Sequence, residues 1–145
     1  MFKIGVFGII FDGRKKVLLC HRLDYDLWNL PCGGLEPGEA PWQGVIREVK
    51  EEVGLDVETE QLAGVYSKPE ENEIVFSFVC KITGGKISTS DEADLIKYFS
   101  FEELPKNMSL KQKERIKDAL LEKEETILKI QVEPSSIDLI KQGKM

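Results

Sequence analysis

The stretch GGLEPGEAPWQGVIREVKEEVGL, residues 33–55, begins as a loop rich in Gly and Pro and continues with a helical pattern of apolar residues. Pro41 suits the first turn of a helix, where the backbone N–H that proline lacks is not needed. Gly54 suits the position after a helix, because glycine adopts the left-handed backbone conformation without strain. Between them, apolar residues recur at helical intervals. The stretch therefore predicts a loop, a helix from Pro41 and a stop at Gly54.

Three glutamates share one face of this predicted helix. With each residue advancing about 100° around the axis, Glu48, Glu51 and Glu52 fall within an arc of about 100°. An apolar stripe beside this arc consists of Trp42, Val45, Ile46, Val49 and Val53. We expect the helix to bury the stripe against the core and to display the carboxylates beside it. Gly44 falls inside the acidic arc, so we expect open space there for a ligand.

The charges on this face repel one another. Glu48 and Glu52 are four residues apart, a spacing at which like charges destabilise a helix by a few tenths of a kcal/mol. Lys50 points away from the pair, so it does not relieve the repulsion. Most glutamate-rich helix faces are simply solvated. Carboxylates clustered on a rigid face, however, are also the ligands that Mg²⁺ and Mn²⁺ prefer, and the pattern favours a divalent cation held by Glu48, Glu51 and Glu52.

The composition restricts the classes of function. The chain has 145 residues, enough for a hydrophobic core, and we expect residues 1–145 to form a single domain. Its 20 Lys and Arg against 26 Asp and Glu give a net charge of −6, which argues against a broad surface for nucleic acid polymers or anionic membranes. No apolar run reaches the ~20 residues that cross a bilayer, and the N-terminus lacks the features of a signal peptide.

The cysteines indicate a reducing compartment, and neither the cysteines nor the histidine indicates a metal site. The cysteines, Cys20, Cys32 and Cys80, show no CxxC spacing. We therefore expect free thiols in a cytoplasmic protein rather than disulfides or a zinc site. His21 is the only histidine, and we expect it to be a side chain at a strand end rather than a metal ligand.

Strand patterns occur on both sides of the predicted helix. Runs rich in β-branched and aromatic residues predict strands at 2–11, 16–22, 57–67, 73–82 and 94–100, the first two joined by a hairpin turn at DGRKK. Ser100 and Glu103 have the spacing of a capping box for one helical turn. Residues 109–125 predict an amphipathic helix with Leu110, Ile116, Ala119 and Leu120 inward. This order of elements predicts an α/β sandwich with a mixed sheet, and the tail, about 126–145, is given no role.

Residues 33–55 fill every specified position of the pattern G-x5-E-x7-R-E-U-x-E-E-x-G-U, in which U is a bulky aliphatic residue. The residues that match are Gly33, Glu39, Arg47, Glu48, Val49, Glu51, Glu52, Gly54 and Leu55. This is the box of the Nudix (MutT-like) hydrolases, and the chain resembles that family from residue 1 to about 125, including WNLP before the box and SDEADLIKYFSFEELP after it. One departure is Cys32, which stands where the family commonly has a glycine.

The resemblance implies the Nudix α/β/α sandwich, with the box as a loop–helix–loop. The implied reaction is Mg²⁺- or Mn²⁺-dependent hydrolysis of the pyrophosphate linkage in a nucleoside diphosphate joined to another moiety, with an ADP-ribose-like compound or a nucleoside triphosphate as substrate. Such a reaction mainly demands positioning and charge neutralisation, which a metal ion supplies. By resemblance, Glu48, Glu51 and Glu52 bind the metal.

The same resemblance gives structural roles to other residues of the box. Arg47 would pair with a neighbouring carboxylate and orient the acidic cluster, as the planar fork of arginine allows. Glu39 would brace the loop against the helix. Gly33 would allow a turn of the backbone, and Gly54 would end the helix.

The general base is open between two positions. Glu48 is one candidate. Family members often use a carboxylate from a loop outside the box, and Glu92 lies where such a residue would come, with Asp91 and Asp94 as rivals. Geometry must decide between them.

The parts of the chain that contact substrate are less clearly marked. Gly33 and Gly34 belong to the loop that would approach the phosphates. Trp28 and Tyr98 are the aromatic residues we expect to stack on a nucleobase, although most aromatic residues of the chain are expected in the core.

Two alternative functions and the oligomeric state stay open. A Nudix-like regulator that binds a nucleotide without hydrolysing it would be expected to lose box glutamates, and none is missing. An isopentenyl diphosphate isomerase would need more His and Cys for its metal than this chain offers. The expected partner is a small nucleotide, and a homodimer is open because many relatives dimerise.

Overall fold

The computed structural model describes the whole chain, from Met1 to Met145. The helices are α1 (Pro41–Val53), α2 (Leu110–Leu120) and α3 (Ser136–Lys141), with single 3-10 turns at Pro69–Glu71 and Phe101–Glu103. The strands are β1 (Lys3–Ile9), β2 (Val17–Arg22), β3 (Trp28–Asn29), β4 (Cys32–Gly34), β5 (Leu55–Lys68), β6 (Glu73–Gly85), β7 (Ala93–Phe99) and β8 (Ile127–Ile130). Every strand expected from the sequence is present, with its ends shifted by no more than three residues.

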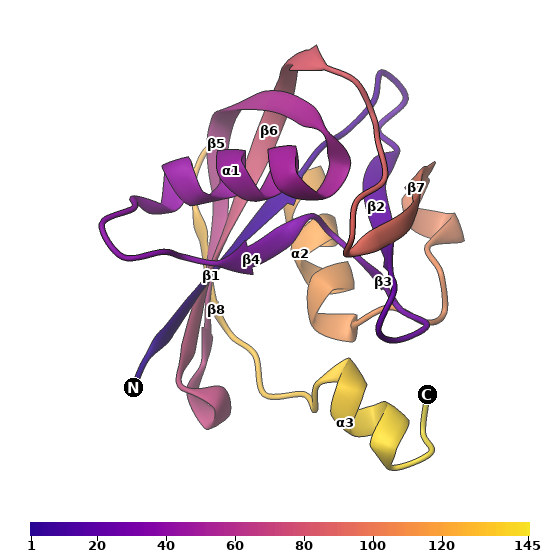
Figure 1. Cartoon of the computed structure of the whole chain (residues 1–145). Coiled ribbons are helices and arrows are strands. Elements are labelled where there is room, and N and C mark those ends of the chain that lie inside the picture. Colours follow the sequence, from indigo (N-terminus) through magenta and orange to yellow (C-terminus); the bar gives the residue numbers. More distant parts are fainter.

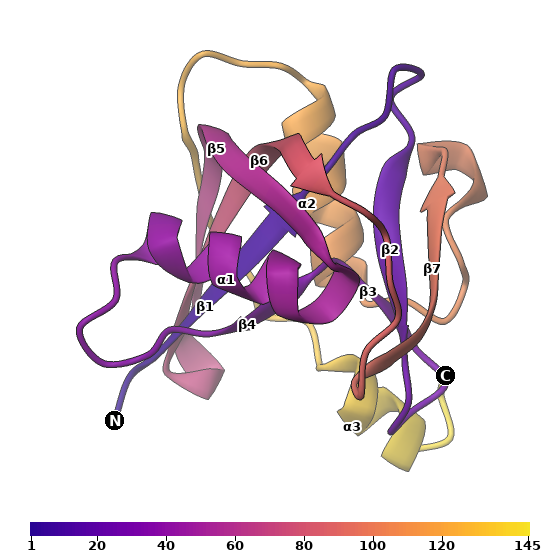
Figure 2. The ribbon, with the colours of Figure 1, turned by 45° about the horizontal axis from the view of Figure 1, so that its top comes forward.

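The strands form two sheets (Figures 1 and 2). Five strands make a mixed sheet in the order β4-β1-β6-β5-β8, in which β1 runs parallel to β6 and β8 parallel to β5. The other three make an antiparallel sheet in the order β3-β2-β7. The second sheet matters for function, because it carries chain segments to the end of α1 where the acidic residues lie.

Of the hairpin predicted at DGRKK, only the turn forms, and β1 and β2 do not pair along their length. Phe11 and Val17 form an isolated antiparallel bridge, and the Asp12 carboxylate accepts hydrogen bonds from the backbone N–H of Arg14 and Lys16 at 2.8 and 2.9 Å. Beyond this turn β1 and β2 separate into different sheets. Each strand finds its main partners far away in the sequence, which local turn chemistry does not specify.

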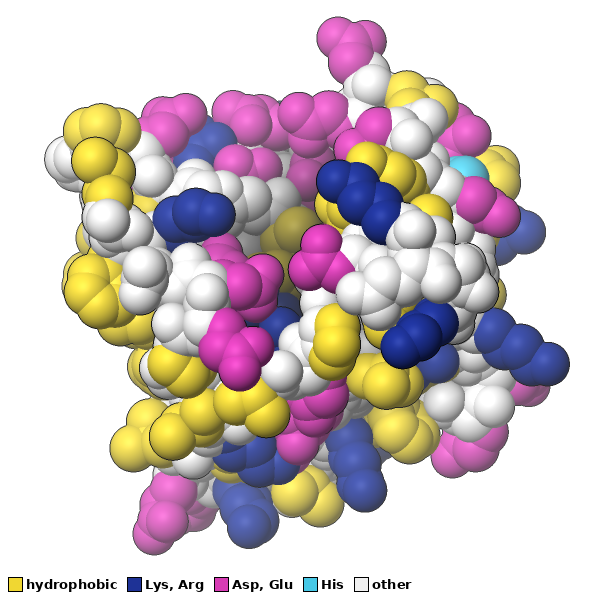
Figure 3. Space-filling model, turned by 90° about the horizontal axis from the view of Figure 1, so that it is seen from below, with side chains coloured by type: hydrophobic (Ala, Val, Ile, Leu, Met, Phe, Trp, Pro, Cys, Tyr) yellow, Lys and Arg dark blue, Asp and Glu magenta, His cyan; other side chains and the backbone are white.

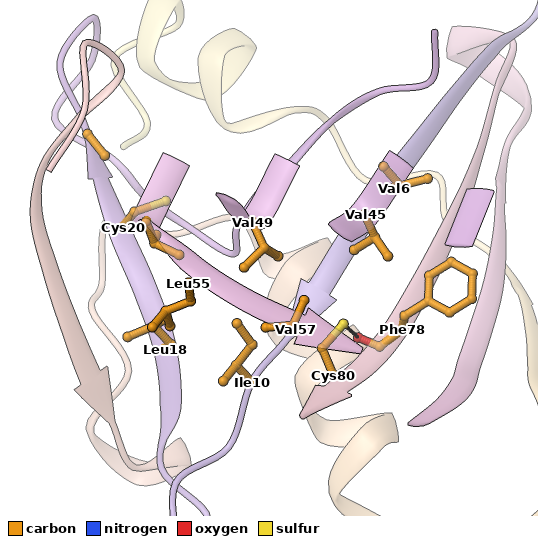
Figure 4. Close-up of a cluster of buried hydrophobic side chains, with 12 residues drawn as sticks. Val6, Ile10, Leu18, Cys20, Val45, Val49, Leu55, Val57, Phe78 and Cys80 are labelled. Atoms are coloured by element: carbon orange, nitrogen blue, oxygen red, sulfur yellow. Dashed lines mark hydrogen bonds between the residues drawn. The ribbon is translucent and has the colours of Figure 1, made fainter. Parts of the chain in front are cut away.

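Alternate residues of the central strands contribute to two different hydrophobic clusters. Val6 and Phe78 belong to the cluster that contains the buried valines of α1, whereas Phe7 and Val79 pack in the cluster that contains Ile116 of α2. Successive side chains of a strand point to opposite faces, so the two helices cover opposite faces of the mixed sheet (Figure 1). Figure 4 shows the cluster beside α1. The predicted α/β/α sandwich is confirmed.

Helix α1 begins at Pro41 and ends at Gly54, whose φ of 80° lies in the left-handed region. Its buried row is narrower than the predicted stripe. The valines at 45, 49 and 53 are fully buried, but Trp42 and Ile46 are 57% and 37% exposed. The prediction that these two pack on the core is wrong, because the sheet contacts only the line of valines along the helix.

The C-terminal part of the chain departs furthest from the predictions. Helix α2 is shorter than expected, and Leu110, predicted to face inward, is 59% exposed at its first position. Ile116 and Ala119 are buried as predicted. The tail is not a simple extension: β8 joins the edge of the mixed sheet, and α3 lies below it in Figure 1. None of the helices is both long enough and apolar enough to cross a bilayer.

Candidate active site

A cavity of about 480 Å³ lies beside the C-terminal half of α1. Its walls come from the end of β2 and the residues after it, from β3 and β4, from α1, and from the segment before β7. The lining residues are Cys20, Arg22, Leu23, Asp24, Asn29, Cys32, Glu52, Asp91, Glu92 and Ala93. Figure 3 shows a face of the molecule that is hollowed near its centre, with acidic side chains gathered around the hollow. The two sheets and α1 therefore bring distant segments to one place.

Glu52 is the buried carboxylate of this cavity. It is 8% exposed, and its Oε2 accepts a hydrogen bond of 3.0 Å from the backbone N–H of Cys32. The Cys20 thiol lies 3.9 Å from the same oxygen. Burial raises the pKa of Glu52 to about 8, and the nearby charges of Glu48 and Glu92 act in the same direction. The site therefore disfavours a negative charge on Glu52 unless a cation is close.

Glu48 is also largely buried, at 9% exposed. A Cβ placed on Gly33 would lie 2.1 Å from the Glu48 carboxylate carbon, so the absence of a side chain at residue 33 makes room for this acid. Gly33 sits in strand β4 opposite Val6 and has no positive φ, so the expected role in a backbone turn is wrong. Burial raises the pKa of Glu48, although the neighbouring guanidinium of Arg47 opposes the shift.

Arg47 stands among the acids of the box. Its Nε and Nη2 donate to the two carboxylate oxygens of Glu39 at 2.7 and 3.0 Å, and its Nη1 donates to Glu48 at 2.9 Å and to Glu51 at 3.2 Å. Nη2 also donates to the carbonyl oxygen of Gly34 at 3.1 Å. One guanidinium thus offsets part of the repulsion along the helix and fastens the preceding loop to it.

Glu39 completes this connection. Its Oε1 accepts a hydrogen bond from the Glu36 backbone N–H at 3.1 Å, and the hydrogen bond from Arg47 lowers the pKa of its carboxyl. The same oxygen would lie 2.9 Å from a Cβ on Gly44, and Leu35 would be closer still at 2.7 Å. The open space expected at Gly44 is therefore absent, because the loop side chains fill it.

The three glutamates of the helix do not meet at one point. No three side chains of His, Cys, Asp or Glu are close enough together to hold a metal ion in this arrangement. Glu51 has a side chain that is 57% exposed and is paired with Arg47, whereas Glu48 and Glu52 are buried. The donor set still fits a hard divalent cation, because it consists of carboxylate oxygens, and a cation beside Glu48 and Glu52 would favour the charged forms that burial disfavours.

The structure separates the three acids proposed outside the box. Glu92 and Asp91 line the cavity with Glu52. Asp94 instead accepts a hydrogen bond of 2.8 Å from Nδ1 of His21, whose Nε2 lies 2.8 Å from Asp26. His21 thus ends β2 as a side chain between two acids, away from the cavity lining.

The two predicted aromatic contacts lie elsewhere. Trp28 packs edge-on against Phe99 and His21, with ring centroids 5.0 and 5.1 Å apart, and Tyr98 packs against the cluster beside α1. Neither lines the cavity. They were expected to stack because they are aromatic, but both belong to the second sheet and pack against neighbouring side chains there.

Several lining residues were missed. Arg22, paired with Asp24 through Nε at 2.7 Å, ends β2, and Asn29 follows Trp28 in WNLP. The position of Asn29 in WNLP, four residues before Gly33, was the available signal. Cys20 and Cys32 are free, and burial raises the pKa of both thiols, so they remain protonated. Cys32 contributes its backbone N–H to Glu52 rather than a thiolate.

Comparison with known proteins gives one consistent result. The sequence model described as NUDIX domain matches residues 1–120. A MutT-like protein of Streptomyces ambofaciens is 34% identical over 120 residues, which cover 83% of this chain and 78% of the relative. A putative 8-oxo-dGTP diphosphatase of Bacillus subtilis is 33% identical over 119 residues, covering 81% of this chain and 80% of the relative.

Solved structures agree with the sequence comparisons. The crystal structure of an ADP-ribose pyrophosphatase from Streptococcus suis superposes with a TM-score of 0.78 and 26% identity, covering 90% of this chain and all of that one. A NUDIX hydrolase from Nitrosomonas europaea gives a TM-score of 0.79 at 26% identity, over 90% of this chain and 79% of that one.

Proposed function

The chain belongs to the Nudix family of pyrophosphohydrolases, and we propose that it hydrolyses the pyrophosphate linkage of a small nucleotide with the aid of a divalent cation. The observation that carries the proposal is a buried carboxylate, Glu52, that lines a cavity large enough for part of a nucleotide, with a second buried carboxylate, Glu48, one turn earlier on the same helix. Burial raises the pKa of both carboxyl groups, and a cation bound beside them would favour their charged forms.

Glu48, Glu51 and Glu52 are the residues that would hold Mg²⁺ or Mn²⁺. A divalent cation supplies neutralisation of phosphate charge and activation of water for attack on phosphorus. Of the three, Glu51 is exposed and therefore free to change its side-chain conformation, while Glu48 and Glu52 are held in place.

The chain itself supplies positioning. The Arg47 fork keeps Glu48 and the loop residue Glu39 in fixed relation to the helix, and the Cys32 N–H does the same for Glu52. Glu92 is our preferred general base, since it lines the cavity, its charge contributes to the raised pKa of Glu52, and no ion pair engages it. Glu48 remains the alternative, although Arg47 already occupies one of its oxygens. Arg22 lies at the same cavity, where it is paired with Asp24.

The proposed substrate class is supported by the chemistry of the box and by the names of related proteins. Proteins similar to this chain carry the names 8-oxo-dGTP diphosphatase and ADP-ribose pyrophosphatase. Both names describe cleavage within a row of phosphates attached to a nucleoside. We therefore place the substrate of this protein among ADP-ribose-like compounds and nucleoside triphosphates.

A product-resolved assay tests the proposal. The purified protein is incubated with Mg²⁺ or Mn²⁺ and a panel of ADP-ribose, dinucleoside polyphosphates, NADH, nucleotide sugars, and canonical or oxidised nucleoside triphosphates. Release of a nucleoside monophosphate, or of pyrophosphate from a triphosphate, supports the proposal and identifies the bond that is cut. Tight nucleotide binding with no product from any compound would favour the non-catalytic regulator instead.

A further inference from the structure

A second cavity, of about 210 Å³, adjoins the first. The two share Arg22, Asn29 and Cys32 as lining residues, so one elongated molecule can occupy both. The remaining walls come from β1, from Leu27, from the end of β5 at Lys68, and from α2 and α3 with the serine that precedes each of them. No Asp or Glu lines this second cavity, in contrast to the acidic first one.

Arg115 of α2 is the most unusual residue of the second cavity. It is 1% exposed, yet none of its nitrogens is paired with a carboxylate. Nε and Nη2 both donate to the same oxygen, Oε1 of Gln131, at 3.2 and 2.8 Å, and Nη1 makes no hydrogen bond. Buried charges in proteins are normally paired, because an uncompensated charge is costly in a medium of low dielectric constant.

The surroundings of Arg115 fix it in this position. Its guanidinium lies over the ring of Phe7 at 4.5 Å and near that of Tyr66 at 5.5 Å. Gln131 is itself held by hydrogen bonds from its Nε2 to Lys111 and Glu114, so its oxygen faces the arginine. The charge is thus presented on a rigid support, with one nitrogen left for a ligand.

Other cations of the cavity are already compensated. Lys111 pairs with Glu71 at 2.9 Å, and Lys68 pairs with Glu71 at 3.2 Å and with Glu73. Arg22 pairs with Asp24. The positive charge that lacks a partner is therefore that of Arg115.

The C-terminal tail contributes a second unsatisfied group. The Oγ of Ser136, at the start of α3, is buried and has no hydrogen-bond partner. Ser136 lines the same cavity as Arg115. The hydroxyl of Ser136 and the guanidinium of Arg115 can both donate hydrogen bonds to a ligand in this cavity, and a ligand with hydrogen-bond acceptors would satisfy both groups.

We propose that the second cavity binds an anionic group, a phosphate or a carboxylate, that the substrate carries at a distance from its scissile diphosphate. Such a group accepts hydrogen bonds from both Arg115 and Ser136 and neutralises the buried charge. The assignment to a substrate group rests on the proposed function, because it places the diphosphate at the neighbouring cavity. Free inorganic phosphate is the other source of the same chemistry.

Binding of inorganic phosphate tests the site without turnover. Calorimetric titrations in EDTA, at constant ionic strength, compare the wild type with Arg115→Gln and Ser136→Ala. Ser77→Ala is a matched control, since Ser77 carries the other buried hydroxyl without a partner and does not line the cavity. We expect phosphate to bind the wild type, affinity to fall about tenfold or more in Arg115→Gln and several-fold in Ser136→Ala, and Ser77→Ala to match the wild type.

Absence of phosphate binding to the wild type, or equal affinity in Ser136→Ala, would overturn the proposal. The serine variant keeps this test valid if Arg115→Gln does not fold. Because metal-free binding needs no catalysis, the result does not depend on whether the protein hydrolyses nucleotides.

A second arm identifies the source of the anion. The kcat/KM values are compared for substrate pairs that differ by one phosphate, such as NADPH and NADH or coenzyme A and its dephospho form. A preference for the phosphorylated member that Ser136→Ala reduces, while Ser77→Ala retains it, supports a substrate subsite. Phosphate binding without any such preference would overturn the substrate assignment and leave the cavity as a site for free anions.

Discussion

The carboxylate of Glu48 occupies the space in which a side chain at Gly33 would have to lie. A Cβ on Gly33 would come 2.1 Å from the carboxylate carbon, whereas one on the adjacent Gly34 would meet nothing within 4 Å. Strand β4 and helix α1 therefore approach each other through a glycine and an acid. This contact ties the geometry of the loop to the position of a proposed metal ligand.

Substitution of Gly33 should displace Glu48. In Gly33→Ala the acid must rotate away from Arg47, because the new methyl group occupies its place. We expect the free energy of unfolding to fall by about 1–3 kcal/mol, in the range for an overpacked site. We also expect kcat/KM to fall, because Glu48 is displaced. Urea unfolding and steady-state kinetics measure the two effects.

Gly34→Ala is the control for this change. The space beside Gly34 is open and its φ is not positive, so the variant should unfold at the urea concentration of the wild type. If Gly33→Ala and Gly34→Ala unfolded at the same urea concentration and hydrolysed substrate at the same rate, the contact between residues 33 and 48 would influence neither stability nor activity.

Glu52→Gln should abolish most of the hydrolysis and leave the fold intact. The amide keeps the size of the side chain but cannot carry the negative charge that a divalent cation requires. We expect kcat/KM to fall by about 100-fold or more, comparable to removal of an electrostatic group at a reacting centre. Circular dichroism checks the fold. Glu58→Gln changes an exposed acid of β5 and should retain activity, while near-normal turnover by Glu52→Gln would contradict the role assigned to the helix.

Mg²⁺ should raise the melting temperature of the wild type. A ligand that binds only the folded state stabilises it by about 2.7 kcal/mol at 100 times its Kd. The buried carboxyl groups of Glu48 and Glu52, whose charged forms a nearby cation would favour, provide the reason for binding. Thermal unfolding with and without millimolar Mg²⁺ measures the shift, which should be smaller in Glu52→Gln. An unchanged melting temperature of the wild type would argue against a metal at this face.

The sequence predicted those structural features that are determined by residues close together in the chain, such as the two ends of helix α1. Helix α1 starts and ends where Pro41 and Gly54 place it, because capping is decided within one turn. The failure at Trp42 and Ile46 has a different cause: periodicity shows which residues share a face, but the width of the buried row depends on the sheet beneath it.

Contacts between distant segments were not predicted, because they depend on tertiary packing rather than on neighbouring residues. Arg22 and Asn29 reach the cavity only because β2 and β3 belong to a second sheet that ends beside α1. The tail was unreadable because β8 is a short edge strand, and its place depends on pairing with β5 more than 50 residues earlier. Arg115 was not among the residues expected to face inward from its helix, and only the packed structure reveals that it is buried.

His21 should make the stability of the fold depend on pH. Its two ring nitrogens lie 2.8 Å from Asp26 and from Asp94, and hydrogen bonds to these acids raise the pKa of His21, that to Asp26 having the largest effect. The folded protein therefore holds a proton more tightly than the unfolded chain, whose histidine has a pKa of about 6.5. Stability from this group is complete below that value and is lost as pH rises through the higher folded pKa.

Unfolding of the wild type and of His21→Gln by urea, at closely spaced pH values from about 5 to 9, isolates this contribution. The wild type should lose stability relative to the variant as pH increases above about 6.5, and Asp26→Asn should shrink the difference by removing the partner with the larger effect. Because Asp26 is highly exposed and Asp94 is partly exposed, added salt should weaken their attraction for the protonated His21 and so reduce the pH dependence of stability. Parallel pH profiles for the wild type and His21→Gln would mean that the histidine titrates alike in the folded and unfolded chains.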